Sequence, residues 1–199
     1  MNAVVKQEDS RHRLLEVAAT EIYENGYQAA SIATILAKTG LSKGALYHHF
    51  PKKLVLGYAV LDEIFIPNCM ARWTQALNDS DPISSISAFL REGLACTTDE
   101  NIRLGCPINN LSQEMSPIDE GFRQRINAAL TYWRKSTEEA FKRGQQAGTV
   151  SLRINTVHNA TFFVASMEGM IGLIKSAQNR ELLDECTQGF IGYLEGLRP

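Results

Sequence analysis

The sequence lacks clustered cysteines and a long uninterrupted apolar run. Its 199 residues include four cysteines, Cys69, Cys96, Cys106 and Cys186, which lie far apart and form no Cys-x-x-Cys pair. This spacing argues against a zinc site and a disulfide framework, and it fits reduced thiols in a cytoplasm. No apolar run reaches the roughly 18 residues of a membrane-spanning helix. The segment MNAVVKQEDSRHR has no apolar core before a cleavage site, so we expect a cytoplasmic protein with no signal peptide and no membrane partner.

Sequence motifs of catalysis are also absent. There is no G-x-S-x-G turn, no phosphate-binding loop and no H-E-x-x-H motif. The acidic residues Glu114, Asp119 and Glu120 are better explained as charges at helix ends. The adjacent His48 and His49 would point roughly 100° apart on a helix, so both cannot easily bind one metal ion. We therefore expect neither an enzyme nor a metal site, and no cofactor.

Charged residues make up an ordinary 21% of the sequence, but they are sorted along the chain. The net charge is −2, while residues 1–57 carry seven basic and five acidic residues and leave −4 for residues 58–199. All five acids precede residue 25, and four lysines fall between residues 38 and 53. This order is typical of a short segment that meets a polyanion. Charge alone favours the simpler alternative of a solvated lysine-bearing face.

The first 50 residues predict three helices. Residues 9–25 carry apolar side chains at three- and four-residue spacings, and Asn25-Gly26 ends that helix. Ser31 is a suitable N-cap for a short helix over 32–40, and Ser42 for another over 43–50. The tight turn TGLS joins these two short helices. A long helix followed by two short ones around such a turn is a helix-turn-helix.

The remaining sequence also reads as helix, with no convincing strand. A fourth helix runs from about Lys52 towards Leu77, and Pro67 predicts a kink near Phe65 or Ile66. Residues 99–107 read as irregular. Further helices are expected over residues 83–96, over 108–115, from Ser116-Pro117 to an end between Gly144 and Gly148, over 154–177 and over 180–196. We predict an all-α fold of about nine helices, with a DNA-binding domain over 1–52 and a second helical domain over 53–199.

The second short helix has the composition of a helix that lies in a DNA major groove. Gly44 and Ala45 allow the backbone to approach base edges, and Lys43 at the leading end can reach a guanine edge or a phosphate. Tyr47 and His48 lie further along the same face, and their hydroxyl and ring N–H groups can donate to phosphate oxygens. Leu46 and Phe50 are expected to point inwards. The predicted DNA-binding residues are Ser31, Ser42, Lys43, Gly44, Ala45, Tyr47, His48, His49 and Lys53.

Each of these residues also has a plainer interpretation. Tyr47 fits equally well as a half-buried tyrosine of the core, and the two histidines fit as ordinary surface residues. The DNA interpretation is favoured because the turn, the lysines and the small residues coincide in one segment. The amide groups of the Ser31 turn and the ammonium of Lys53 would then bind phosphates.

The stretch SIATILAKTGLSKGALYHHFPKKLVL resembles the DNA-binding region of the TetR family of bacterial transcriptional regulators. The family's G-[VL]-S turn, its Y-x-[HY]-F and its following lysine match residues 40–42, 47–50 and Lys53. The preceding RLLEVAATEIYENGYQAASI resembles the family's first helix, with Ala30 where a threonine is usual. The resemblance covers roughly the first 55 residues. It implies a homodimeric repressor that binds a palindromic double-stranded operator and that a small-molecule effector releases, with activation as the alternative.

The last two expected helices suit a dimer contact. Interior glycines cost up to about 1 kcal/mol each relative to alanine, so their presence indicates close helix approach. The alternative is close packing within one chain. Because two-fold operators mirror the symmetry of the protein, we expect contact between two copies. The glycines in question are Gly169, Gly172, Gly189, Gly192 and Gly196.

The middle of the chain is rich in aromatic and sulfur-containing residues, which fit either an apolar effector cavity or a packed core. The motif GCPINN adds amides just after Cys106, and similar Gly-Cys motifs followed by an amide occur in TetR-like regulators. Cys106 at a helix start also raises a redox-sensing hypothesis, although a buried structural cysteine is commoner. The predicted effector-binding residues are Trp73, Phe89, Cys106, Asn109, Asn110, Phe122, Trp133, Phe163 and Met167.

Overall fold

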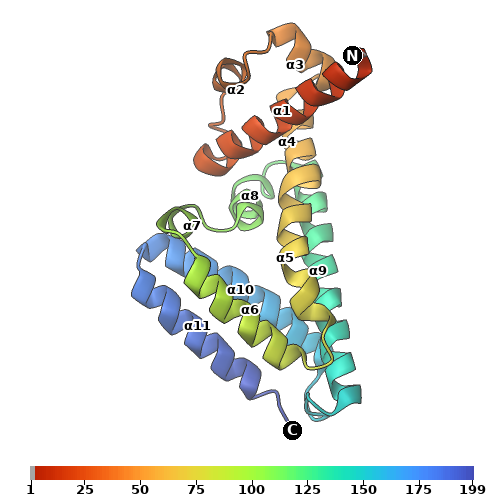
Figure 1. Ribbon diagram of the computed structural model, residues 1–199, viewed down its shortest axis with the longest axis vertical. Coiled ribbons are helices and arrows are strands. Elements are labelled where there is room, and N and C mark those ends of the chain that lie inside the picture. The colour runs from red at the N-terminus through yellow and green to blue at the C-terminus, as the bar shows by residue number, and fades with distance from the viewer. Residues whose placement is uncertain (1–2) are drawn as a thin grey trace. The chain divides into compact units, whose positions relative to one another are not determined.

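A computed structural model describes the backbone of residues 3–199 and the side chains of residues 9–199. The charges of Lys6 and Glu8, which entered the charge balance above, lie outside the described side chains. All regular structure in the described part is helical, so the predicted all-α fold class is confirmed. The helices are labelled in Figure 1. They are α1 (Ala3–Asn25), α2 (Ile32–Thr39), α3 (Lys43–His49), α4 (Lys53–Val60), η1 (Leu61–Phe65), α5 (Ile66–Asn78), α6 (Pro82–Cys96), α7 (Asp99–Leu104), α8 (Pro107–Met115), α9 (Glu120–Ala147), α10 (Thr156–Ala177) and α11 (Arg180–Glu195).

By its internal contacts the chain divides into two compact units. The first unit comprises Met1–Cys69 and Asn110–Ile126, and the second comprises Met70–Asn109 and Asn127–Pro199. Three helices, α5, α8 and α9, therefore contribute residues to both units. The sequence predicts a boundary between a DNA-binding domain and a second helical domain at residues 52 and 53. That boundary concerns which residues bind DNA, and it stays a prediction.

The first unit contains the expected three-helix arrangement, and its caps explain where each helix begins. The Ser31 side chain accepts a hydrogen bond from the Thr34 amide, and the Ser42 side chain accepts one from the Ala45 amide. Gly40 ends α2 in the left-handed conformation with φ of 66°, which costs glycine little. The helix-turn-helix predicted from these residues is confirmed.

Helix α4 continues into α5 through a single π-helical segment. The Ile66 amide donates to the Leu61 carbonyl five residues earlier, in place of the usual partner four residues earlier. Pro67 follows at once, and its ring removes one amide donor and displaces the preceding turn. The irregularity expected near Phe65 or Ile66 is therefore present, as a local widening of the helix.

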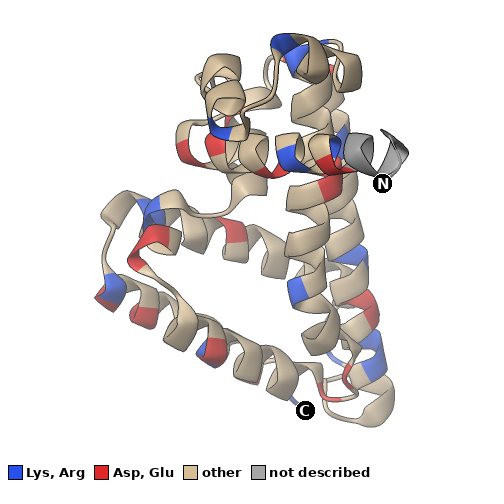
Figure 2. Cartoon of the chain, turned by 45° about the horizontal axis from the view of Figure 1, so that its top comes forward, with Lys and Arg blue, Asp and Glu red and all other residues tan. Residues whose placement is uncertain are grey.

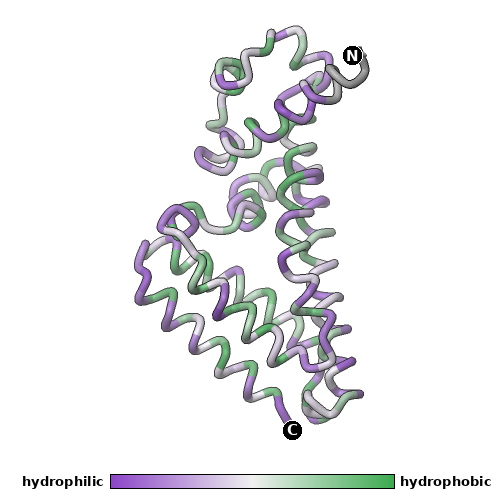
Figure 3. The backbone as a smooth tube through the Cα atoms, in the orientation of Figure 1, coloured by the Kyte–Doolittle hydropathy of each residue, from purple (hydrophilic) through white to green (hydrophobic). Residues whose placement is uncertain are grey.

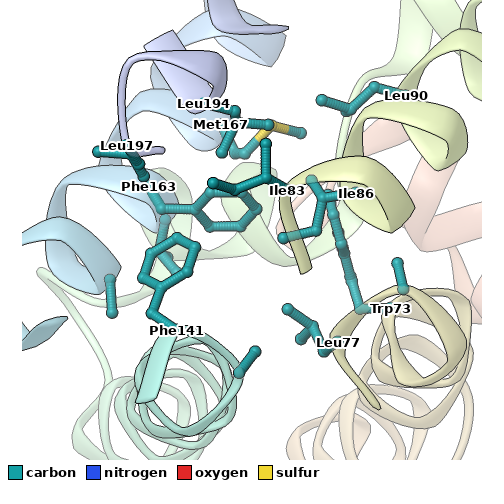
Figure 4. Close-up of a cluster of buried hydrophobic side chains, with 14 of the residues drawn as sticks. Trp73, Leu77, Ile83, Ile86, Leu90, Phe141, Phe163, Met167, Leu194 and Leu197 are labelled. Atoms are coloured by element: carbon teal, nitrogen blue, oxygen red, sulfur yellow. The ribbon is translucent and has the colours of Figure 1, made fainter. Parts of the chain in front are cut away.

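The second unit has a continuous apolar core. Figure 4 shows side chains of this core, where Phe163 and Met167 of α10 converge with Phe141 of α9, together with Ile83 of α6 and Trp73 of α5. Helices α6, α10 and α11 lie side by side around it in Figure 1. Along α11 the hydrophilic and hydrophobic colours of Figure 3 alternate with the helical turns, as expected of a helix with one buried face.

Two local expectations are wrong. The segment 99–107 was expected to be irregular, yet α7 forms there because Thr98 and Asn101 make a reciprocal capping box. Helix α9 does not begin at Ser116-Pro117. It begins at Glu120, because the Asp119 side chain caps the helix by accepting a hydrogen bond from the Phe122 amide.

Helix α9 ends within the segment from Gly144 to Gly148, as expected. It passes through Gly144 to Ala147. A Cβ at Gly144 would lie 2.5 Å from Val150 Cγ2, so this glycine is needed for close packing rather than for termination. The chain turns at Gly148, where φ is 76°.

Two helical segments are long and apolar enough to cross a membrane by length and composition, namely Lys53–Asn78 and Thr156–Ala177. The sequence predicted no such span because it contains no uninterrupted apolar run of that length. Both segments place side chains in hydrophobic cores, among them Leu61 and Phe163, which are completely buried. Core helices of globular proteins meet the same criterion, so the finding is weak support for a membrane span.

Candidate nucleic-acid interface and effector region

Helix α3 presents one buried and one exposed face. Leu46 and Phe50 are 0% and 1% exposed, which confirms that they hold the helix on its neighbours. Tyr47 is 38% exposed, and Lys43 is exposed as well. The Lys43 ammonium lies 5.9 Å from the centre of the Tyr47 ring. This short helix therefore directs a cation and a phenol to solvent from a firmly anchored base.

The leading end of α3 leaves room for an external surface. Gly44 is exposed and Ala45 is half-buried. A Cβ at Gly44 would meet only the Ser42 hydroxyl, at 3.8 Å. Packing within the chain does not require a glycine at this position, whereas close approach to base edges is made easier by one.

His49 faces the chain more than the solvent. Its Nε2 lies 3.0 Å from the Ser10 hydroxyl of α1. Burial, assisted by the neighbouring His48 and Arg11, lowers the pKa of His49 below its usual value. A neutral imidazole offers no charge to a phosphate at neutral pH. Of the two histidines, only His48 is exposed on the predicted DNA-binding surface.

Arg11 joins α1 to η1 and to Phe50 at the end of α3, contacts that the sequence did not predict. Its guanidinium donates two hydrogen bonds to Glu63, at 2.7 and 2.6 Å, and lies 5.2 Å from the centre of the Phe50 ring. The hydrogen bond from Arg11 holds the pKa of Glu63 below its usual value. Because both partners are about 40% exposed, the pair contributes orientation more than stability.

Lys53 lies against the turn between α1 and α2. Its ammonium donates to the Gln28 carbonyl at 3.0 Å and lies 4.9 Å from the centre of the Tyr27 ring. Burial lowers the pKa of Lys53, while the charge of Glu114 opposes this effect. The lysine is thus fixed beside the turn that leads to Ser31, whose own amide donates to Glu21 at 3.2 Å.

Glu114 holds the same turn from the other side. Its carboxylate accepts hydrogen bonds from the amides of Tyr27 and Gln28, at 2.9 and 2.7 Å. The sequence interpretation of Glu114 as a helix-end charge missed this role, because the partners are more than 80 residues away. The same interpretation is correct for Asp119, which caps α9.

Glu114→Ala should lower the free energy of unfolding by about 1.5–3 kcal/mol, because hydrogen bonds to charged groups contribute at this level. Urea unfolding of the variant and of the natural protein measures the difference. The matched control is Glu139→Ala, which removes an exposed carboxylate of α9. Equal losses in the two variants would show that Glu114 does not support the turn.

Lys53→Ala should weaken binding to every duplex by a similar factor and lower the salt dependence of affinity by about one phosphate contact. The reason is that an ammonium beside the turn reaches the sugar-phosphate backbone but no base edge. Fluorescence anisotropy at several salt concentrations measures the slope. The control is Lys135→Ala on α9, where an exposed lysine is removed far along the sequence. An unchanged slope for Lys53→Ala would remove this residue from the interface.

Two family descriptions match the chain. Residues 14–56 match "Bacterial regulatory proteins, tetR family", and residues 82–190 match "Tetracyclin repressor-like, C-terminal domain". The second match alone covers more than half of the sequence. The chain belongs to the TetR family. This confirms the resemblance noted in the helix-turn-helix segment.

Individual relatives of this TetR-family protein are regulators. It is 31% identical over 182 residues to the HTH-type transcriptional regulator LmrA of Bacillus subtilis (strain 168), covering 86% of this chain and 89% of that protein. It is 28% identical over 177 residues to the HTH-type transcriptional repressor DhaR of Mycobacterium sp. (strain GP1), covering 88% and 87%. The crystal structure of regulatory protein TetR from Rhodobacter sphaeroides is similar with a TM-score of 0.80 and 26% identity, covering 92% and 97%. The TetR-family protein is thus a helix-turn-helix transcriptional regulator and not an enzyme.

Five of the predicted effector residues of this TetR-family regulator gather in the second unit. The Trp73 ring centre lies 4.6 Å from that of Phe89 and 5.2 Å from that of Trp133. Phe163 lies 5.5 Å from Trp73, and Met167 is buried in the same core. The indole Nε1 of Trp133 is buried without a hydrogen-bond partner. The cluster therefore combines apolar rings with one unused donor.

The other four predicted residues lie elsewhere. Cys106 and Asn109 contact Glu168 of α10, as described below. Asn110 and Phe122 belong to the first unit, where the Phe122 ring centre lies 5.0 Å from that of Tyr27 and 5.1 Å from that of Tyr58. The nine predicted residues are thus divided between the two units. Their role in effector binding stays a prediction.

A surface pocket of about 440 Å³ in the second unit is lined by residues of both charges and contains none of the nine. It lies where α7 and the turn between α10 and α11 come together. Its lining residues are Asp99, Glu100, Ile102, Arg103, Gln178 and Arg180.

Glu168 is an ionisable group that the sequence predictions missed. The Cys106 thiol donates to its Oε1 at 3.7 Å, and the Asn109 amide donates to its backbone carbonyl at 3.0 Å. Burial, with a smaller effect of Cys106, raises the pKa of Glu168 to about 9. A carboxyl with this pKa is protonated and neutral at pH 7.

This pKa makes stability depend on pH in a known direction. The unfolded carboxyl has a pKa of about 4.3, so the folded state holds the proton more tightly. The stability contributed by protonated Glu168 is complete below about pH 4 and is lost as pH rises towards about 9. The melting temperature of the natural protein should therefore fall between pH 5.5 and pH 8 relative to that of Glu168→Gln. Parallel melting curves for the two proteins across this range would contradict the assignment.

Proposed function

We propose that the protein is a cytoplasmic, homodimeric transcriptional repressor that binds a palindromic operator and is released from it by a small-molecule effector. The observation that carries the DNA-binding part is helix α3, whose Leu46 and Phe50 are buried while Lys43 and Tyr47 face solvent. A helix held in this way can enter a major groove without moving its own core residues. The similarity to a relative named as a repressor supports the sign of regulation.

The proposed dimer contact is the exposed face of α10 together with the neighbouring face of α11. A Cβ placed on Gly169, Gly172, Gly189 or Gly192 would find nothing within 4 Å. Close packing within the chain, the alternative left open by the sequence, therefore does not explain these four glycines. Gly196 differs, because a Cβ there would lie 3.2 Å from the Tyr193 carbonyl.

The exposed face of α10 carries no acidic, lysine or arginine side chain. Phe162 and Leu173 are 54% and 53% exposed on it, and the Phe162 ring centre lies 5.0 Å from that of Tyr193 on α11. Figure 2 shows charged residues of both signs along α9 and α11, so the α10 face is distinct in composition. An uncharged, partly aromatic face of this kind is typical of a surface covered by a partner. The face, called the α10 face below, consists of His158, Thr161, Phe162, Ala165, Gly169, Gly172, Leu173 and Ser176.

Selection from a pool of random duplexes tests the proposal and does not require a known operator sequence. The full-length protein should enrich an inverted repeat, because two recognition helices related by a two-fold axis read the same half-site twice. A reporter gene placed behind the enriched sequence should be expressed less when the protein is present. Enrichment of no sequence would contradict operator binding, and increased expression would assign activation in place of repression.

A redox-responsive regulator acting through Cys106 is the alternative to release by a ligand. Cys106 is 8% exposed and its thiol is hydrogen-bonded to Glu168, an arrangement that favours a structural thiol over a reactive one. Operator affinity before and after peroxide treatment distinguishes the two. A large loss of affinity that Cys106→Ala abolishes would favour redox control.

A further inference from the structure

Glu168 is the one acidic residue of α10, and half of its carboxyl group has no partner in the described structure. Its Oε2 atom is buried and makes no hydrogen bond. Buried polar atoms are nearly always paired in native proteins, and an unpaired one is costly. The two other buried side-chain atoms of this kind in the described residues, on Ser87 and Trp133, are not ionisable at neutral pH. Glu168 is therefore the polar group that most needs an explanation.

The contacts of Glu168 decide where its proton lies. Oε1 accepts the hydrogen of the Cys106 thiol, so the carboxyl hydrogen of the neutral acid belongs on Oε2. The backbone on either side is fixed as well, because Asn109 donates to the Glu168 carbonyl. A hydroxyl donor thus lies next to the start of α8 without an acceptor from the chain. Buried carboxylic acids held neutral in this way donate hydrogen bonds to ligand oxygens in some enzymes.

Apolar side chains are buried on the two helices that meet near Glu168, since α7 packs against α10. Ile102 and Leu104 of α7 are buried, and Met167 precedes Glu168 in the core. A Cβ at Gly105 would lie 3.0 Å from Lys175 Cδ and 3.5 Å from Ile171 Cγ2, so the aliphatic part of the lysine covers this glycine. Glu168 as a whole residue is half-buried while its Oε2 atom is buried, which places the carboxyl group just beneath the surface of the unit.

We propose that Glu168 is the polar anchor of the effector site, and that it donates its carboxyl hydrogen to an acceptor oxygen of a neutral, largely apolar effector. A carbonyl oxygen fits this role best, because it accepts a hydrogen bond without adding charge to an apolar site. A cationic amine would instead require Glu168 to ionise next to Cys106. This inference rests on the proposed release by a ligand and names the class of that ligand.

Three six-membered-ring probes with different polar groups test the inference. Cyclohexanone supplies a neutral acceptor, cyclohexylamine supplies a cation of similar size, and methylcyclohexane supplies neither. Ligand-observed NMR on the full-length protein should show saturable binding of the ketone and at least about tenfold weaker binding of the other two. Absence of ketone binding, or stronger binding of the amine, would overturn the assignment.

Two substitutions separate the hydrogen bond from the shape of the site. Glu168→Gln keeps a neutral donor and should bind the ketone within about threefold of the natural protein. Glu168→Leu removes the donor and should bind it at least about tenfold more weakly. The matched control is Ser87→Ala, which removes another unpartnered buried oxygen of the same unit and should leave ketone affinity unchanged. Equal affinities for Gln and Leu, or an equal loss in the control, would refute the role of Glu168.

The pH dependence of ketone affinity is a second test of the inference, and it does not require the leucine variant. With a Glu168 pKa of about 9, ketone affinity should fall about tenfold between pH 7 and pH 10 in the natural protein and stay constant in Glu168→Gln. The same proteins are tested for operator binding without any probe. Unchanged ketone affinity together with intact operator binding would refute this inference alone. Loss of operator binding in the natural protein itself would refute the proposed function.

Discussion

Gly169→Arg is expected to convert the protein to a monomer and to lower operator affinity by at least about 100-fold. The substitution places a cation in the middle of the α10 face, which carries no acidic side chain to pair with it. Burying an unpaired charge between two copies is strongly unfavourable. Loss of the dimer also removes the second recognition helix, and linking two binding sites typically strengthens binding by 10²–10⁴-fold. Sedimentation equilibrium gives the mass, and a gel shift with the selected operator gives the affinity.

Gly93→Arg is the control for this experiment. Gly93 lies in the helix α6, and a Cβ there also meets nothing within 4 Å. Both variants replace a helical glycine that has free space around it by arginine. They differ in that Gly93 lies outside the α10 face. This variant should remain a dimer and bind the operator normally. A dimeric Gly169→Arg variant, or equal losses in both variants, would show that the copies meet elsewhere.

Tyr47→Ala is expected to weaken operator binding by about 10- to 100-fold, which corresponds to about 1–3 kcal/mol, and to leave folding intact. Stability should hold because the ring is exposed and is not part of the core that contains Leu46 and Phe50. Binding should fall because the phenol and the adjacent Lys43 ammonium present one surface to the DNA. A gel shift and a thermal melt on the same sample measure both quantities.

Two further tyrosine variants sharpen this test. Tyr47→Phe keeps the ring and removes only the hydroxyl, so a loss as large as that of the alanine variant would assign the effect to a hydrogen bond with phosphate. Tyr132→Ala removes a tyrosine of α9 that is 62% exposed, and it should bind the operator normally. Unchanged affinity in Tyr47→Ala would discredit α3 as the recognition helix.

Local signals made the first unit predictable from the sequence. Ser31 and Ser42 cap the two short helices where their hydroxyls were expected to do so. The four-residue spacing of Leu46 and Phe50 correctly indicated the buried face of α3. Such features depend on residues within one helical turn, and a single sequence contains them in full.

The missed residues all act through contacts that are distant in sequence. Glu114 binds amides more than 80 positions away, Arg11 binds Glu63 across 52 positions, and Cys106 binds Glu168 across 62. No local pattern distinguishes such partners from solvated charges. One signal was available for Glu168, since it is the single acid in an apolar helix, where an ionisable side chain must find a partner or stay neutral.

The predicted effector residues come together only in part for a related reason. Aromatic composition identified Trp73, Trp133 and Phe163, which do come together. It also selected Phe122, which packs with Tyr27 in the first unit. Apolar rings form packed cores and ligand cavities alike, so composition alone does not separate the two.

Hydroxyl-radical footprinting of the complex, combined with its mass, tests most directly whether two copies present α3 to one duplex. The account predicts two chains for each operator, with protected patches on one side of the DNA whose centres are separated by about one helical turn, roughly 34 Å, or a multiple of it. Protection should weaken in both patches together in Tyr47→Ala. A complex with one chain and a single protected patch would contradict paired recognition by two identical helices.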